Sequence, residues 1–244
     1  MKKIDGKVSV IMPAHNEAPM IKENVILTEK TLKKFNTDFE IVLIDDGSSD
    51  DTWGRIKELA EEFPNIKATR NMQNFGKGRA LKKGFRFAKG DYIVFLDSDI
   101  DLHPAQLDTF FDIMQLDNVD IVIGSKRHPN SVLNYPLQRR VVSTIYFFLI
   151  KVMFGLPIRD TQTGLKLFKR QVLEKVFPKI VVKAFAFDLE ILVNAHRLGY
   201  KIAEAPVRID MRRQFSRIRF KDMFNTGIDT LAIFYRMYFT RLYR

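Results

Sequence analysis

The chain has 244 residues, of which 46% are hydrophobic, and its formal net charge at pH 7 is +11. It contains no cysteine, which excludes disulfides, thiolate metal sites and a cysteine nucleophile. Its glycines and prolines are scattered without a repeat period or a low-complexity block, which excludes disordered and solenoid architectures and indicates a fully folded chain.

Two lysines near the N-terminus lead directly into a strand-like run, without the apolar stretch and cleavage site of a signal peptide. We therefore expect a cytoplasmic protein. The longest uncharged apolar run, 141–150, ends at Lys151, well short of the roughly 20 residues that span a bilayer. We expect no transmembrane segment.

Short apolar runs predict the strands of a parallel sheet in the first half of the chain. Polar or turn-forming residues follow each run, and the segments between the runs have helical spacing, as 104–116 does. The four expected strands are Val8–Met12, Glu40–Ile44, Tyr92–Leu96 and Asp120–Gly124. This order indicates an α/β fold with a Rossmann-like nucleotide-binding sheet flanked by helices, in which ligands bind beyond the carboxyl ends of the strands.

The second half of the chain has a less regular pattern. An apolar and aromatic segment covers 141–154, a helix is expected over 188–198 and a strand over 201–207. From residue 220, hydrophobic residues recur mostly at steps of three and four, which predicts a C-terminal amphipathic helix. We therefore divide the chain into a domain over 1–219 and a helix over 220–244.

Charge is distributed unevenly along the chain. Residues 1–125 hold 17 lysines and arginines against 21 acidic residues, a net charge of −4, whereas 126–244 hold 23 against 8, a net charge of +15. A half-chain this basic is attracted to phosphate-bearing substrates, anionic lipid head groups or nucleic acid.

One expected strand runs directly into three alternating carboxylates, Asp97, Asp99 and Asp101. Magnesium and manganese in phosphate sites are typically held by one or two carboxylates together with phosphate oxygens. An isolated Asp-x-Asp is more often a solvated turn, but two further strand ends also carry polar motifs. Asp45 and Asp46 begin a turn that contains Gly and Ser, and the first strand ends in the polar loop 13–17.

Four motifs thus occur in a fixed order. They are Pro13–Glu17, Asp45–Ser48, Asn74–Gly78 and Asp97–Asp99. Together they resemble the ordered signature of family 2 glycosyltransferases, which adopt the GT-A fold. The resemblance implies a catalytic domain over 1–219, in which 1–125 bind a nucleotide sugar and 126–219 bind the acceptor.

The resemblance also implies roles for individual residues. Asp99 coordinates Mg²⁺ or Mn²⁺, Asp97 contacts the metal or the ribose, and Asp101 is a third candidate metal ligand. By motif position, the residues implied in donor binding are Pro13, His15, Glu17, Ile44, Asp46, Lys77, Ser98 and Lys126.

Three motifs in the second half narrow the resemblance. They are Gly124–Arg127, Arg159–Gly164 and Phe187–Glu190. They resemble dolichyl- and polyprenyl-phosphate hexosyltransferases, especially the glucose-transferring branch, with the mannosyl branch close. The implied reaction is inverting transfer of glucose or mannose from UDP-glucose or GDP-mannose to a polyprenyl or dolichyl phosphate. Asp101 departs from the pattern, because related mannosyl enzymes can have Gln there.

A phosphate acceptor is already anionic, so it needs positive charge more than it needs a general base. Arg139, Arg213 and Arg217 are candidate phosphate ligands, with Arg139 placed in catalysis, because guanidinium groups bind phosphate in a bidentate manner. If the acceptor is instead the hydroxyl of a glycan, a base is required. Asp160, Asp188 and Glu190 are the candidates, and Asp188 is the best of them. A non-enzymatic alternative, a basic nucleic-acid-binding module, rests on charge alone and lacks a nucleic-acid-reading motif.

The segments 141–154 and 220–244 are rich in Phe and Tyr, with Arg or Lys nearby, as interfacial helices are. We therefore expect peripheral attachment to the inner, cytoplasmic face of the membrane. The same helices could instead form a homodimer interface, and a partner protein could supply a membrane anchor.

Overall fold

The structure of the chain is a computed structural model that describes residues 4–35, 37–133, 137–182, 186–209, 220–240 and 242–243. Within two helices, the side chains of 137–143, 145 and 220–224 fall outside this description. Two candidate phosphate ligands, Arg213 and Arg217, therefore lie outside the described residues, and so does the side chain of Arg139.

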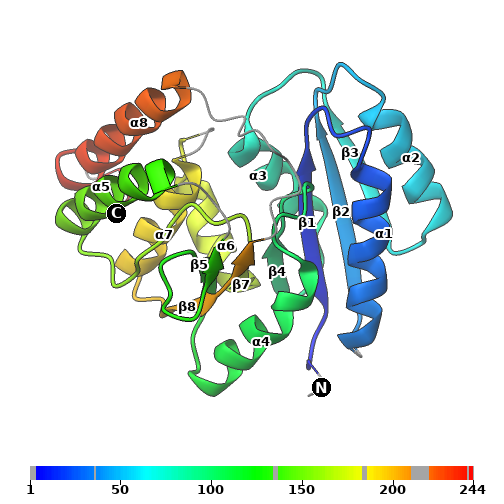
Figure 1. Cartoon of the computed structure of the whole chain (residues 1–244), viewed down its shortest axis with the longest axis horizontal. Helices are drawn as coiled ribbons and strands as arrows, with labels where there is room; N and C mark the ends of the chain where they lie inside the picture. The colour runs from blue at the N-terminus through cyan, green and yellow to red at the C-terminus, as the bar shows by residue number, and fades with distance from the viewer. Residues whose placement is uncertain are drawn as a thin grey trace.

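A seven-stranded sheet forms the centre of the molecule (Figure 1), with strand order β3-β2-β1-β4-β7-β5-β8. The strands are β1 Val8–Ala14, β2 Phe39–Asp46, β3 Ile66–Asn71, β4 Tyr92–Phe95, β5 Ile121–Ser125, β7 Lys166–Lys169 and β8 Ile202–Pro206. Strand β7 is antiparallel to both of its neighbours, whereas the other pairs of this sheet are parallel. A separate two-stranded sheet pairs β6 Val132–Leu133 with β9 Arg208–Ile209.

Helices cover both faces of the large sheet. They are α1 Ile21–Leu32, α2 Thr52–Glu62, α3 Lys77–Phe87, α4 Leu107–Leu116, α5 Leu137–Phe154, α6 Arg170–Val176, α7 Phe187–Arg197 and α8 Phe220–Tyr238. Buried residues of α1, α2 and α4 form one core, and those of α3, α5, α6, α7 and α8 form the other.

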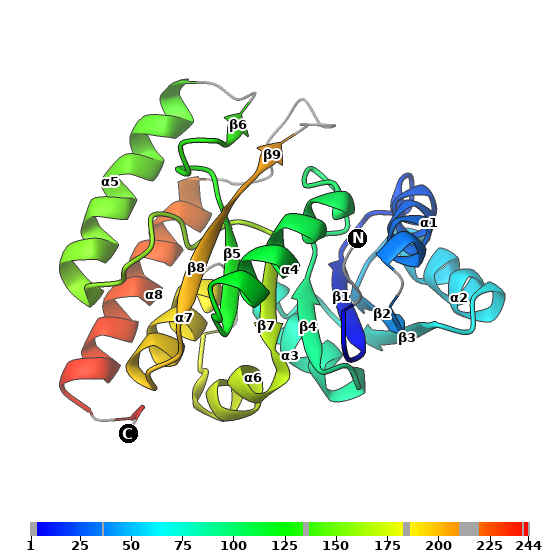
Figure 2. The same ribbon diagram turned by 90° about the horizontal axis from the view of Figure 1, so that it is seen from below.

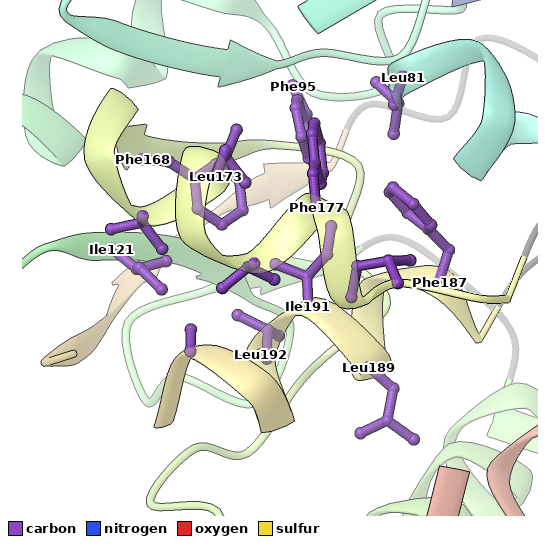
Figure 3. Packing of buried hydrophobic residues seen from close by; sticks show 14 of the residues in the cluster. Leu81, Phe95, Ile121, Phe168, Leu173, Phe177, Phe187, Leu189, Ile191 and Leu192 are labelled. Carbon is purple, nitrogen blue, oxygen red and sulfur yellow. The ribbon is translucent and has the colours of Figure 1, made fainter. Parts of the chain in front are cut away.

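The strands are apolar because both of their faces are buried. Along β1, Val10 and Met12 belong to the core beneath α1, while Ile11 belongs to the core beneath α3. Figure 3 shows part of this second core, in which Phe95 of β4 stacks on Phe177 at a ring separation of 6.3 Å. The alternation of side chains along each strand therefore supplies both cores.

The four strands predicted from apolar runs are confirmed as β1, β2, β4 and β5, and the predicted late helix and strand are α7 and β8. Two strands of the large sheet were not predicted. Strand β3 has four polar residues in six and lies at the sheet edge, and β7 has lysines at both of its ends. Neither strand contains a long apolar run, so the local sequence does not identify it. Pairing with neighbouring strands, rather than local sequence, places these two segments in the sheet.

Helices α5 and α8 lie side by side at one end of the molecule (Figures 1 and 2). The hydroxyl of Tyr146 is 3.0 Å from that of Thr230, and the rings of Phe154 and Phe234 are 6.1 Å apart. Within the described part of the chain, neither these helices nor any other combines the length and apolarity needed to cross a bilayer.

Candidate functional site

The carboxyl ends of β1, β2 and β4 meet at one edge of the sheet, because these strands are parallel. The loop after β1 is held against the turn after β2 by its own amides. Asn16 N donates to Ser48 Oγ at 3.0 Å, and Glu17 N donates to Thr52 Oγ1 at 2.8 Å. Two of the predicted strand-end motifs therefore form one connected surface.

The two adjacent carboxylates of β2 have donors within the protein. Asp45 is fully buried, and its carboxylate forms an ion pair with Arg70 Nε at 2.8 Å. Asp46 accepts hydrogen bonds from Asn71 Nδ2 at 2.7 Å and from Gly76 N at 2.9 Å. The resemblance implied a role for Asp46 in binding the donor. In the structure, Asp46 holds the loop that leads into α3.

A tight turn brings that loop onto the strand ends. Gly47 has φ of +70°, and a Cβ added to it would lie 2.2 Å from the backbone carbon of Gln73. Only glycine combines this left-handed backbone with such a close approach. The turn after β2 thus packs against the loop that follows β3 and leads to Lys77, the first residue of α3.

Lys77 and Asp97 form the central ion pair of the site, with Nζ 2.5 Å from Oδ1. Burial tends to lower the pKa of Lys77, but the charges of Asp97, Asp188 and Asp99 raise it well above its usual value. Gly164 lies against the other oxygen of Asp97, since a Cβ at Gly164 would be 2.1 Å from Oδ2. Asp97 therefore lies between the start of α3 and the segment before β7, with 37% of its side chain exposed.

Asp99 has a different environment, in which burial and the charges of Asp97, Asp101 and Glu17 raise its pKa to about 7. A carboxylate surrounded by other carboxylates is destabilised as an anion, and a divalent cation relieves this repulsion. A set of carboxylate oxygens of this kind fits Mg²⁺ or Mn²⁺.

The expectation that Asp97, Asp99 and Asp101 together form a metal site stays a prediction. Among the described residues, no group of three carboxylates or imidazoles is arranged to hold a metal ion. The reason lies partly in Asp97, one of whose oxygens is committed to Lys77. To a metal ion this part of the chain would thus offer one or two carboxylates.

Asp188, predicted from the motif in the second half, lies in the same group of charges. It is 5% exposed, and Lys166 Nζ is 3.1 Å from its Oδ1. This contact has ion-pair distance but not hydrogen-bond geometry, so Oδ1 accepts no hydrogen bond from the described residues. Burial lowers the pKa of Lys166, as does Lys77, while Asp188 opposes the shift.

The start of α7 is fixed against the start of α3. A Cβ on Gly78 would lie 2.4 Å from Cγ of Phe187, so the backbone of α3 packs directly on this ring. Phe187 also lies 5.9 Å from the ring of Phe177 (Figure 3). Asp188 directly follows Phe187 on α7, and Lys77 directly precedes Gly78 on α3. The two charged residues therefore lie on helices that are in contact.

Other predicted donor-binding residues differ in how they are placed. His15 Nδ1 lies 3.1 Å from the carbonyl oxygen of Asp46, and Pro13 pairs in register with Ile44. Ile44 itself is fully buried in the core beneath α3, and its role in donor binding stays a prediction. In a strand, side chains alternate between the two faces, and Ile44 points into the core.

Ser98 and Lys126 also have partners inside the protein. Ser98 is 5% exposed, and its carbonyl accepts a hydrogen bond from Asn24 at 2.8 Å. Lys126 Nζ lies 3.5 Å from Asp160, whose carboxylate also accepts the Lys126 amide at 3.0 Å. Contact of these two residues with the donor stays a prediction.

Sequence reasoning did not assign roles to Gly164 and Lys166, which the structure brings to Asp97 and Asp188. Gly164 ends the motif Arg159–Gly164, and Lys166 lies two residues after it. Their contacts with Asp97 and Asp188 depend on the antiparallel placement of β7, which no motif predicts. A lysine at the start of a buried four-residue strand was the available signal, since a buried lysine needs a charged partner.

The sequence of the chain matches the model of a known protein family. Residues 9–177 match the family model described as Glycosyl transferase family 2. The chain belongs to this family. It is accordingly a glycosyltransferase, and its seven-stranded α/β sheet is that of the GT-A fold.

Several curated proteins are similar in sequence. Glycosyltransferase AglD of Haloferax volcanii is 30% identical over 233 residues, which is 95% of this chain and 37% of AglD. Dolichyl-phosphate beta-glucosyltransferase of Dictyostelium discoideum is 32% identical over 242 residues, covering 88% of this chain and 74% of the relative. A dolichyl-phosphate beta-glucosyltransferase of Trichomonas vaginalis is 33% identical, covering 94% and 74%. The chain thus spans 37% of the archaeal relative's length.

Solved structures share the fold. Glucosyl-3-phosphoglycerate synthase from Mycobacterium tuberculosis, in complex with Mn²⁺, UDP and phosphoglyceric acid, has a TM-score of 0.72 and 22% identity. The match covers 95% of this chain and 78% of that one. The same protein in complex with Mn²⁺, UDP-glucose and phosphoglyceric acid has a TM-score of 0.71 and 20% identity.

Proposed function

We propose that the protein transfers a hexosyl group from a nucleoside diphosphate sugar to a polyprenyl or dolichyl phosphate, with inversion at the anomeric carbon. The names of the Dictyostelium and Trichomonas relatives support a dolichyl phosphate acceptor and a glucosyl group. UDP-glucose is the favoured donor, because it accompanies the structural relative as well. GDP-mannose is the alternative donor.

The arrangement of Lys77, Asp97 and Asp99 at the carboxyl edge of the sheet carries this proposal. Parallel sheets bind nucleotides beyond this edge. The first turn of α3 directs backbone N–H groups and the ammonium of Lys77 to the same place, and both favour the negative charge of a diphosphate. In the reaction, these groups hold the diphosphate while the bond between the sugar and its phosphate breaks.

A divalent cation belongs in the proposed reaction. Asp99 and the oxygen of Asp97 that faces Gly164 would hold Mg²⁺ or Mn²⁺, and the cation would neutralise charge on the departing diphosphate. Mn²⁺ in the structural relative supports manganese without excluding magnesium. Asp101, whose amide donates to Asp99 Oδ1 at 3.3 Å, shapes the turn that presents Asp99.

A phosphate acceptor brings its own nucleophilic oxygen and needs no base. The described site contains Asp188 and Lys166 beside the donor residues, and Lys166 supplies positive charge there. Further positive charge is proposed from Arg139, Arg213 and Arg217, on the basis of the sequence alone. With the family known, the nucleic-acid-binding alternative is set aside.

Asp188 gives the second candidate acceptor a specific basis. Its Oδ1 is buried and accepts no hydrogen bond from the described residues, so it could receive a proton from an attacking hydroxyl. In that case the substrate would be a glycan or another alcohol. Loss of transfer in Asp188→Asn, with activity on water-soluble acceptors, is the pattern this alternative predicts.

Membrane attachment is proposed through α5 and α8. Large apolar side chains are exposed on both helices: Phe148, Leu149, Val152, Ile228, Leu231, Tyr235 and Tyr238. Exposed apolar and aromatic residues that gather on neighbouring helices are typical of interfacial binding, and α5 adds three basic residues without an acidic one. A lipid-linked acceptor has its phosphate at such a surface, which favours a membrane over a second copy of the chain. Attachment at the cytoplasmic face is part of the proposal.

Side-by-side transfer assays test the donor and acceptor together. Labelled UDP-glucose and GDP-mannose are each incubated with polyprenyl phosphate, liposomes and MnCl₂, and the lipid product is extracted and counted. Faster labelling of the lipid from UDP-glucose supports the proposal. Labelling from GDP-mannose alone would reject the glucosyl assignment, and no labelled lipid from either donor would reject the acceptor.

A further inference from the structure

Glu190 is a carboxylate that is fully buried in the first turn of α7, two residues after Asp188. A buried charge is tolerated only when hydrogen bonds or opposite charges replace its lost hydration. The partners of Glu190 therefore show what this residue holds in place.

Both oxygens of Glu190 are occupied. Oε2 accepts the backbone amides of Val181 at 2.9 Å and Val182 at 2.8 Å. Oε1 accepts the hydroxyl of Tyr243 and lies 3.3 Å from Nη2 of Arg236. Glu190 thus has four donors and is unsuited to act as a general base, although its motif position would allow that role.

The donors come from parts of the chain that are far apart in sequence. Val181 and Val182 follow α6, Arg236 lies in the last turn of α8, and Tyr243 lies beyond that helix. One carboxylate therefore joins the first turn of α7 to α8 and to the segment before α7. We call Glu190, Arg236 and Tyr243 the Glu190 cluster.

Tyr243 is held as firmly as the carboxylate. Its side chain is 2% exposed, and its hydroxyl accepts a hydrogen bond from Arg236 Nε at 2.8 Å. Its backbone carbonyl accepts one from Lys179 Nζ at 2.9 Å. Burial and the hydrogen bond to Glu190 raise the pKa of the Tyr243 hydroxyl, so it remains a donor at neutral pH.

The turn that Glu190 anchors carries two contacts of the site. Phe187 fills the space left by Gly78 on α3, and Asp188 faces Lys166. We propose that Glu190 is a positioning residue for sugar transfer, which fixes the first turn of α7 to α8 and so holds Asp188 and Phe187 against the donor site. This inference rests on the proposed function, because it assumes that transfer takes place at Asp97 and Asp188.

A consequence concerns α8, whose exposed apolar side chains are the proposed membrane contact. Arg236, on the same helix, links that contact to the site through Glu190. The orientation of the protein on a lipid surface and the geometry of Asp188 are therefore set by one connected group of residues. Loss of the link should lower the rate of the chemical step more than the affinity for the donor.

The test compares Tyr243→Phe with Tyr200→Phe. The first change removes only the hydroxyl that donates to Glu190, and the ring still fills the core. Tyr200 lies after α7, and its hydroxyl is 3.5 Å from the carbonyl of Gln171, away from the Glu190 cluster. We expect kcat for transfer to fall about 10- to 100-fold in Tyr243→Phe with donor KM within about twofold of wild type, and no comparable loss in Tyr200→Phe.

Glu190→Gln, which keeps the shape but removes the charge facing Arg236, should reproduce the loss of kcat. Hydrogen exchange gives a second readout, since the amides of Val181 and Val182 should exchange faster in Tyr243→Phe than in Tyr200→Phe. Equal kcat in the two tyrosine variants would overturn the positioning role, and unchanged exchange would overturn the link itself. If the wild-type protein transfers sugar to no lipid, the proposed function is rejected. Hydrogen exchange needs no acceptor, so it still tests the link between Glu190 and Tyr243 in that case.

Discussion

Lys77 Nζ lies 2.5 Å from Asp97 Oδ1, so the first residue of α3 is joined to the residue that follows β4 and Leu96. This ion pair connects two motifs that are 20 positions apart in sequence, and it leaves Asp99 among other carboxylates. In the proposed function, this pair sets the side of the site on which positive charge faces a diphosphate.

The first prediction concerns Lys77→Met. Removing the ammonium should weaken binding of the nucleoside diphosphate about 10-fold or more, since a hydrogen bond to a charged group contributes roughly 1.5–3 kcal/mol. Calorimetric titration with UDP measures this directly. Lys83→Met is the matched control on the same helix, because Lys83 donates to the carbonyl of Arg70 outside the site. Equal affinities in the two variants would remove Lys77 from the donor site.

The second prediction concerns Gly164→Ala. The added Cβ would lie 2.1 Å from Asp97 Oδ2, so Asp97 must move and donor binding should be lost while the fold persists. Gly227→Ala is the control, because no atom lies within 4 Å of the added Cβ, and it should raise the free energy of unfolding by up to about 1 kcal/mol. UDP titration and urea unfolding separate the two effects. Normal binding by Gly164→Ala would contradict the placement of Asp97 against Gly164.

The third prediction concerns the metal. Chelation with EDTA should abolish transfer, and MnCl₂ or MgCl₂ should restore it. Asp99→Ala should lower kcat by at least about 100-fold, because electrostatic stabilisation of a leaving group is worth several kcal/mol. Asp112→Ala, at an exposed position on α4, should behave as wild type. Retention of full activity by Asp99→Ala would exclude Asp99 as a metal ligand.

The fourth prediction concerns α8. Leu231 is 60% exposed, and Leu231→Asp should reduce flotation with liposomes that contain anionic lipid. Leu116, at the end of α4, is 71% exposed, so Leu116→Asp controls for the general effect of a surface charge. Light scattering in the absence of lipid tests the alternative. A dimer that Leu231→Asp converts to a monomer, with flotation unchanged, would assign this face to self-association.

The fifth prediction concerns stability and pH. Asp160 is buried, and although burial tends to raise its pKa, Lys126 and hydrogen bonds from Gln162 and Thr163 lower it below the usual value. The stabilisation from this carboxylate is therefore present above the unfolded-state pKa and is lost as pH falls through the folded-state value. Asp160→Asn should destabilise the protein at pH 7 and weaken the decline in stability between about pH 5 and 3. An unchanged slope in urea unfolding would contradict this assignment.

The positions of Asp46, Asp97 and Asp99 could be predicted from sequence because each follows an apolar run long enough to identify a buried strand. Parallel strands place their carboxyl ends on one edge, so the three motifs had to meet. The sequence did not predict that Ile44, in the same stretch, is fully buried in the core beneath α3, or that Asp45 and Asp46 have polar partners within the protein.

The residues that the sequence did not assign depend on long-range placement. Lys166 and Gly164 reach the site because β7 is inserted antiparallel between β4 and β5, and no local pattern specifies that order. The proposed positioning role of Glu190 could not be predicted from the sequence either. Its partner Tyr243 is separated from it by 53 positions, and only packing of α8 against α7 brings them together.

The most direct test of the proposed activity compares polyprenyl phosphate with the matching polyprenol in liposomes, with labelled UDP-glucose and MnCl₂. The two lipids differ only in the phosphate, so the ratio of labelled products measures whether the acceptor is the phosphate or a hydroxyl. We predict a labelled product from polyprenyl phosphate and none from polyprenol. Equal or greater labelling of polyprenol would contradict a phosphate acceptor and favour the alternative in which Asp188 acts as the base.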